Sequence, residues 1–230
     1  MRYGPMCDRK SGKGWWDEGG EYWYCTLIEN RTRLRLGRGV GRTESDAAQR
    51  IWRYWRWTLG VVDHPPPLVS DGWGGHKDAL LEVFGKQTAQ RRLSGKNWHY
   101  LQVVKVHNDY HRVIGIKPRL VWGKALQAQH PLSPNVAYVE RTHLTSRLMS
   151  ARLQRKSLRF SKRLQPLISS SFWCDSVYNL VHAHKSLRQP SLLPGHRWMP
   201  RSPAMAAGLT DHLWSVYELL SCVPIFINSS

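Results

Sequence analysis

The sequence lacks the short motifs that mark several common enzyme classes. Four cysteines are present, but none forms a C-x-x-C pair, which excludes the usual zinc and dithiol redox motifs. The glycine-rich run at 37–41 lacks the Gly-Lys-Ser/Thr ending of a phosphate-binding loop, and no serine nucleophile elbow occurs. No apolar run approaches the length of a transmembrane helix, and the N-terminus has no apolar signal-peptide core. We therefore expect no membrane partner and no signal peptide.

Acidic residues are also scarce, and this scarcity points to a polyanionic partner. The 230 residues include 16 Asp and Glu against 34 Lys and Arg, for a formal net charge of +18. Cations that neutralise phosphates release counterions, which makes binding to nucleic acid strong and sensitive to salt. The basic residues gather between Arg141 and Arg163 instead of spreading evenly. We expect a nucleic-acid partner; a basic surface that only confers solubility is the alternative.

The hydrophobic patterning predicts an α/β fold, with a mixed sheet flanked by helices and a helical C-terminal extension. Thr43 is a suitable N-cap for the first helix, and Thr210 for the last. Leu144, Leu148 and Ala151 predict an apolar stripe on the helix at 135–154. The predicted strands are 21–29, 33–40, 68–70, 100–106 and 113–122; the predicted helices are 43–59, 73–84, 135–154, 165–182 and 210–220.

Asp71 is the first candidate for a metal ligand. It directly follows the apolar run Leu68-Val69-Ser70, which we interpret as a short buried strand. A carboxylate at the end of such a strand is held rigidly and remains open to substrate. The alternative is a plain Asp-Gly turn formed with Gly72, which is a common structural feature.

Glu140 is the second candidate, on the predicted helix that begins near residue 135. Helical spacing places Glu140, His143 and Arg147 on one face, at i, i+3 and i+7. A carboxylate ahead of many cations suits a divalent metal with DNA phosphates beside it, so His143 and Arg147 are candidates for phosphate contacts. The alternative is a solvated helix face of mixed charge. Two carboxylates from distant parts of the chain can hold Mg²⁺, although three are normally required.

Several motifs, in order along residues 20–220, resemble those of DDE transposases of insertion sequences similar to insertion sequence one. The segment 69–75 (VSDGWGG) is similar to the motif around the second aspartate of that family, and 139–144 (VERTHL) resembles its glutamate motif. The further matching segments are 152–157 (RLQRKS), 160–164 (FSKRL), 178–179 with 184–188 (YN and HKSLR), and 203–212 with Trp214 and 218–220 (PAMAAGLTDH, then ELL).

The resemblance implies a ribonuclease-H-like fold at 1–185, with an extended, proline-rich tail and a short helix at 186–230. It implies Mg²⁺ or Mn²⁺ held by Asp71 and Glu140, and cleavage and joining of DNA at transposon ends and target. It also implies DNA-backbone contacts from Arg141, Arg155, Lys156 and Lys162. A cytoplasmic, nucleoid-associated protein of a prokaryote, able to form homo-oligomers, is the expected setting.

The sequence departs from the family pattern at its beginning. The lysine-rich turn expected after the first aspartate corresponds to residues 9–13, which places that aspartate at or before Met1. Asp8 is the nearest substitute, although it follows several residues too late. In addition, His143 stands where the family usually has asparagine. We therefore expect a truncated first strand and impaired catalysis; a DNA-binding remnant without catalysis, or a nuclease with the same fold, are the alternatives.

Overall fold

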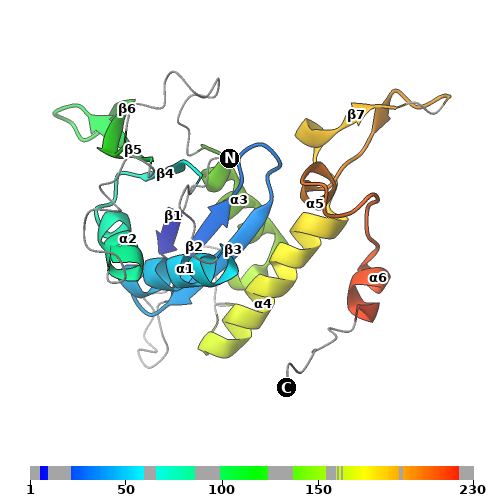
Figure 1. Cartoon of the computed structure of the whole chain (residues 1–230), viewed down its shortest axis with the longest axis horizontal. Helices are drawn as coiled ribbons and strands as arrows, with labels where there is room; N and C mark the ends of the chain where they lie inside the picture. Colours follow the sequence, from blue (N-terminus) through cyan, green and yellow to red (C-terminus); the bar gives the residue numbers. More distant parts are fainter. Residues whose placement is uncertain are drawn as a thin grey trace.

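The computed structural model describes residues 6–9, 22–59, 66–85, 99–123, 137–153, 159, 161, 163–191 and 194–222. Its fold is α/β, with helices against two sheets of three strands each and one two-stranded ribbon (Figure 1). This arrangement confirms the predicted mixed sheet flanked by helices. Within the described part of the chain, no helix is long and apolar enough to cross a bilayer.

The first sheet is antiparallel, with the order β1-β2-β3. It comprises β1 (Met6–Arg9), β2 (Trp23–Ile28) and β3 (Arg35–Gly41). The predicted hairpin of β2 and β3 is confirmed, and its turn is held by the Glu29 carboxylate, which accepts hydrogen bonds from the backbone N–H groups of Arg31 (3.0 Å) and Thr32 (2.6 Å). These bonds satisfy turn amides that the strand ladder leaves unpaired.

Helix α1 (Glu44–Leu59) packs on this sheet, as the spacing of its apolar residues predicts. The Thr43 hydroxyl accepts a hydrogen bond from the backbone N–H of Asp46 at 3.0 Å, which confirms the predicted N-cap. Ile51, Trp52 and Trp55 are buried on the inner face of the helix. The helix comes very close to Gly39 of β3, because a Cβ atom there would lie 2.1 Å from the carbonyl oxygen of Ala47.

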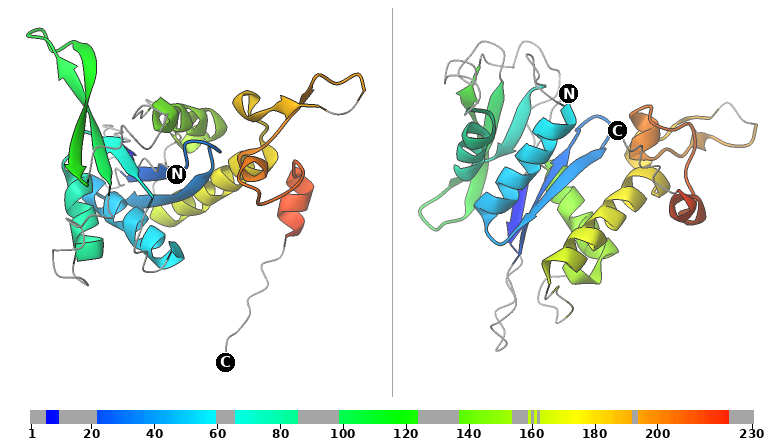
Figure 2. Two further views of the ribbon diagram at one scale, coloured as in Figure 1. Left: turned by 45° about the horizontal axis from the view of Figure 1, so that its top comes forward. Right: turned by 60° about the horizontal axis from the view of Figure 1, so that its bottom comes forward.

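The second sheet has the order β4-β5-β6 and mixes both strand directions. Strand β4 (Leu68–Asp71) pairs in parallel with β5 (Tyr100–His107), and β5 pairs antiparallel with β6 (Val113–Trp122). Helix α2 (Gly75–Gly85) lies between β4 and β5 in the chain and packs on α1. The β5–β6 hairpin projects from the body of the protein (Figure 2). One hydrophobic core joins β2, α1, α2, β4 and β5, so the two sheets share an interior.

Helix α3 (Ala137–Met149) and the short 3₁₀ turn η2 (Ala151–Leu153) replace the single helix predicted at 135–154. The predicted apolar stripe is wrong, because Leu144 and Leu148 are 42% and 75% exposed. The buried face instead carries Val139, Thr142, His143 and Ser146. This face is largely polar because it meets two buried arginines of β3, which are described below.

Helix α4 (Leu164–Ser176) continues into one π-helical turn, η3 (Val177–Val181), and both correspond to the predicted helix at 165–182. In this turn the Asn179 side chain accepts a hydrogen bond from the backbone N–H of Arg35 (3.0 Å) and donates one to the backbone carbonyl of Arg35 (2.8 Å). An amide side chain thus pairs with the edge of β3 as a neighbouring strand would, and it fixes α4 beside the first sheet.

The C-terminal part is built from short elements. These are η4 (Lys185–Leu187), β7 (Gln189–Pro190), β8 (Trp198–Met199), α5 (Pro203–Ala206) and α6 (Val216–Ser221). The last helix begins six residues after the predicted Thr210 cap, because Ser215 and Glu218 form a complete capping box. The Thr210 hydroxyl instead accepts a hydrogen bond from the Trp214 indole at 3.0 Å.

Candidate functional site

Asp71 lies at the C-terminal end of β4, as the sequence predicts. Leu68, Val69 and Ser70 before it are buried, and the Asp71 side chain is 27% exposed. Its Oδ1 accepts a hydrogen bond from the backbone N–H of Trp73 at 3.2 Å. The carboxylate is therefore held at the strand end and remains partly open to solvent.

His76 lies directly behind Asp71 at the start of α2. Its Nε2 is 3.5 Å from Asp71 Oδ1, and the Trp73 indole meets the imidazole edge to face with ring centres 4.9 Å apart. Complete burial lowers the pKa of His76 to about 3, so the imidazole is neutral at physiological pH. Asp71 consequently has no cationic partner on this side.

The charges of Glu140 and Lys105 also influence the pKa of Asp71. Burial raises the pKa of Asp71, the Trp73 N–H bond and the Lys105 charge lower it, and the Glu140 charge raises it again. Lys105 Nζ lies 3.5 Å from Glu140 Oε1, and both side chains are about half exposed. The end of β4, the middle of β5 and the first turn of α3 therefore bring Asp71, Lys105 and Glu140 into one electrostatically coupled site.

Glu44 is a further acidic residue of this site, and sequence reasoning missed it. It occupies the first position of α1, where a carboxylate also interacts favourably with the helix dipole. Burial raises the pKa of Glu44, and the negative charge of Asp71 raises it further. The N-terminus of α1 thus contributes a third carboxylate that is electrostatically coupled to Asp71. No local sequence signal reports this proximity, because it depends on how α1 packs across the sheet.

The donor set suits one hard divalent cation. Magnesium is usually held by one or two carboxylates, with water and substrate phosphates as its remaining ligands. The charge of Glu140 raises the pKa of Asp71, the charge of Asp71 raises the pKa of Glu44, and a cation would relieve this repulsion. Within the described ranges, however, no three Asp, Glu, His or Cys side chains lie close enough to hold a metal by themselves. The residues fit an ion that also needs ligands from water or substrate.

The other candidate residues are placed differently from one another. Asp8, the nearest substitute for the first aspartate, lies within β1, opposite Tyr24 of β2, and its side chain lies outside the described part. Arg141 is exposed beside Glu140, and Arg147 is half-buried. Arg155, Lys156 and Lys162, which the resemblance implies as DNA contacts, lie outside the described residues.

His143 does not face the surface, which corrects the expectation of a phosphate contact. The side chain is 1% exposed and packs against the Tyr24 ring, with the ring centres 5.1 Å apart. Burial, together with the charges of Arg38 and Arg35, lowers its pKa to about 3. Glu140 and His143 are neighbours on α3, but the helix turns one toward solvent and the other toward the first sheet.

No protein-family model matches the chain, and no curated protein has a significantly similar sequence.

Proposed function

We propose that this protein is a DNA-binding transposase of impaired activity, which cleaves and transfers strands in a metal-dependent reaction, as DDE transposases do at the ends of an insertion sequence. The observation that carries the proposal is the coupling of Asp71, at the end of β4, to Glu140 on α3. These two residues were selected from sequence motifs far apart in the chain. Their electrostatic interaction supports a common site.

The order of the elements supports a ribonuclease-H-like fold. Three antiparallel strands are followed by a helix, a strand that ends in Asp71, a helix and a parallel strand, and a later helix carries Glu140. In such a fold the carboxylates come from different elements and meet at one edge of the sheet. Asp8 lies within the first strand of the other sheet, opposite Tyr24 of β2.

In the proposed site Asp71 and Glu140 hold Mg²⁺ or Mn²⁺, with Glu44 close to Asp71. The metal would activate water or a 3′-hydroxyl and stabilise the leaving oxygen. Lys105, which contacts Glu140 at 3.5 Å, is placed to bind a phosphate of the substrate, and Arg141 presents an exposed cation on the same helix. The net charge of +18 supplies the general attraction to DNA.

The second candidate is a DNA-binding protein without catalysis. It is favoured by the Lys105–Glu140 ion pair, in which a lysine supplies the positive charge that a metal would otherwise bring. It is also favoured by the lack of a three-residue metal cluster among the residues that the structure describes.

A strand-cleavage assay with matched variants distinguishes these candidates. The purified chain is incubated with Mg²⁺ and DNA, beside Asp71→Asn, Glu140→Gln and Asp109→Asn. Asp109→Asn removes one carboxylate charge from the exposed β5–β6 turn and serves as the control. We expect both site variants to lose cleavage by orders of magnitude, with the control unchanged.

The products and the binding constants complete the test. Joined DNA ends support a transposase, whereas cut ends without joining favour a nuclease. If the wild-type chain binds DNA in a salt-sensitive manner but does not cut it, and both site variants bind equally well, the proposal of catalysis is wrong and the second candidate holds.

A further inference from the structure

Two arginines of β3 are buried against a single carboxylate of α4. Arg35 Nη1 and Arg38 Nη2 lie 2.8 Å and 2.7 Å from the same oxygen, Oδ1 of Asp175, and Arg38 Nε donates to Oδ2 at 3.1 Å. The three side chains are 0%, 3% and 12% exposed. Because two guanidinium groups share one carboxylate, the cluster holds one surplus positive charge away from water.

The arginine donors are satisfied unequally. Arg35 Nη2 donates to the carbonyl of Thr142 and Arg38 Nη2 to the hydroxyl of Ser146, both at 3.1 Å. Arg38 Nη1 is also buried, yet it has no hydrogen-bond acceptor in the described structure. A buried charged donor without an acceptor costs free energy, so this nitrogen favours an anion in its vicinity.

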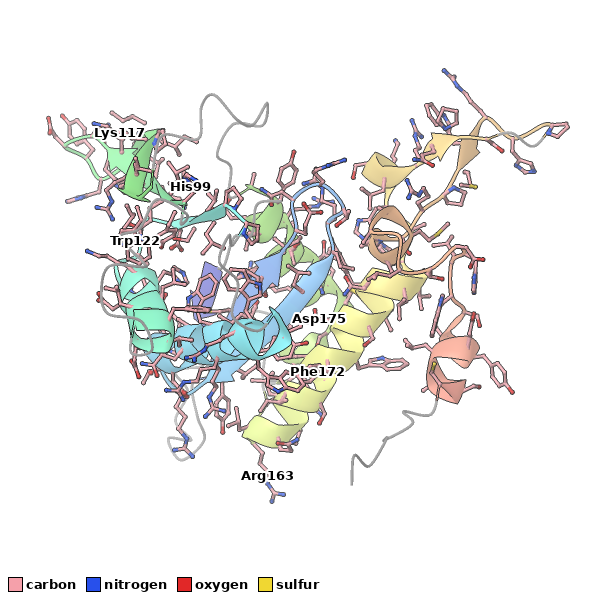
Figure 3. All side chains as sticks on the ribbon, in the orientation of Figure 1. His99, Lys117, Trp122, Arg163, Phe172 and Asp175 are labelled. Atoms are coloured by element: carbon pink, nitrogen blue, oxygen red, sulfur yellow. The ribbon has the colours of Figure 1, made fainter. Side chains whose placement is uncertain are left out.

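A cavity of about 180 Å³ lies beside Arg38, between β3, α1 and α4. This volume is several times the roughly 30 Å³ that a water molecule occupies in the liquid, so it admits a larger group. Figure 3 labels Phe172 and Asp175 on α4, the helix that packs beside β3. The residues that line the cavity are Arg38, Val40, Arg50, Ile168, Ser171 and Phe172.

The lining combines cations with apolar surface. Arg50 of α1 donates its Nε to Asp46 at 2.8 Å, and within the described residues its two terminal amino groups have no acceptor. Arg50 can therefore donate to phosphate oxygens, while the buried charge of Arg38 adds to the attraction for an anion. Val40, Ile168 and the Phe172 ring supply walls against which an apolar or flat group can pack.

We propose that this cavity binds the phosphate of a nucleotide, with the phosphate on Arg50, beside the buried charge of Arg38, and the nucleoside against Phe172. The phosphate neutralises the surplus charge of the arginine cluster. The ligand is either a free mononucleotide or the terminal nucleotide of a DNA strand, since both carry the same group. This site is formed by β3, α1 and α4 and does not depend on cleavage at Asp71.

Calorimetric titration with thymidine 5′-monophosphate tests the proposal. Arg50→Gln is the informative variant because Arg50 is surface-exposed and its removal leaves the buried cluster intact. Loss of one charge-assisted contact should weaken binding about tenfold. Arg53→Gln is the matched control, since Arg53 lies on the same helix, also pairs with one carboxylate and does not line the cavity. It should leave the affinity almost unchanged.

Titrations with further ligands test the phosphate contact, the Phe172 wall and the source of the nucleotide separately. Inorganic phosphate should bind more weakly than the nucleotide, and thymidine should not bind; equal affinity for phosphate and nucleotide contradicts the role of the Phe172 wall. A 5′-phosphorylated oligonucleotide that displaces the mononucleotide supports a DNA strand end as the ligand, and failure to displace it supports a free nucleotide. Absence of nucleotide binding, or equal weakening by Arg50→Gln and Arg53→Gln, overturns the proposal.

Discussion

Replacing Asp175 with asparagine should destabilise the protein more than any exposed charge removal. In the wild-type structure the Asp175 carboxylate contacts Arg35 and Arg38 at 2.8 Å and 2.7 Å, and both arginines are almost completely buried. Asparagine keeps the shape and one acceptor oxygen but leaves two buried cations facing each other without an anion. Breaking a buried ion pair in this way costs about 3–5 kcal/mol.

The assay is urea unfolding followed by tryptophan fluorescence, for which the 12 tryptophans provide the signal. For a chain of this size, 1 kcal/mol corresponds to roughly 2–4 °C in Tm, so a parallel thermal scan should show a fall of about 6–20 °C. The control is Glu82→Gln, which removes a carboxylate 3.5 Å from the exposed Arg53. Surface pairs of this kind contribute only about 0–1 kcal/mol.

The difference in stability between the Asp175→Asn and Glu82→Gln variants tests whether the buried arginines depend on Asp175. The Asp175→Asn variant should unfold at much lower urea concentration with an unchanged dependence on denaturant, and Glu82→Gln should resemble the wild type. If both variants lose less than about 1 kcal/mol, the buried arginines do not depend on Asp175, and our reasoning on the cluster is refuted.

Three further predictions concern pH, packing and DNA binding. The pKa of His143 is about 3 in the folded protein and near 6.5 in the unfolded chain, so the unfolded state takes up a proton first as the pH falls. The contribution of His143 to the free energy of unfolding is complete above pH 6.5 and should be lost between pH 6.5 and 3, by up to about 1.4 kcal/mol per pH unit. Unfolding curves of the His143→Asn variant should show a weaker dependence of stability on pH. Gly39→Ala places a Cβ 2.1 Å from the Ala47 carbonyl oxygen and should lower the free energy of unfolding, measured with urea, by about 1–3 kcal/mol. The control Gly74→Ala, whose Cβ would meet nothing within 4 Å, should lower it much less. Equal losses of unfolding free energy in the two variants would contradict the close packing of α1. Lys105→Gln should weaken DNA binding and reduce the slope of log affinity against log salt by about 1; an unchanged slope would show that Lys105 does not contact phosphate.

The parts of the fold that depend on local signals could be predicted from the sequence. Thr43 marks the start of α1, and the apolar run before Asp71 marks β4, because capping and strand patterning act over a few residues. The same reasoning failed for α3. Leu144 and Leu148 face solvent there because the helix turns its polar side toward buried charges from another element, which no local pattern reports.

The candidate site also combines residues that local motifs identify with residues that only the packing of the fold brings together. Asp71 and Glu140 could be selected from motifs, since a strand-end aspartate and a helix glutamate have local signatures. The proximity of Glu44 to Asp71 and the ion pair of Lys105 with Glu140 arise from the packing of separate elements. His143 was misassigned for the related reason that helical spacing gives its neighbours on α3 but not the direction of the core.

Binding of Mn²⁺, measured by electron paramagnetic resonance, tests most directly whether Asp71 and Glu140 form one metal site. The titration is performed with DNA present, because the two carboxylates need additional ligands from water or substrate. We predict that the wild-type protein and Asp109→Asn bind the ion, and that Asp71→Asn and Glu140→Gln each weaken binding by at least about tenfold. Equal binding by all four proteins, or a loss confined to one of the two site variants, would contradict the proposed site.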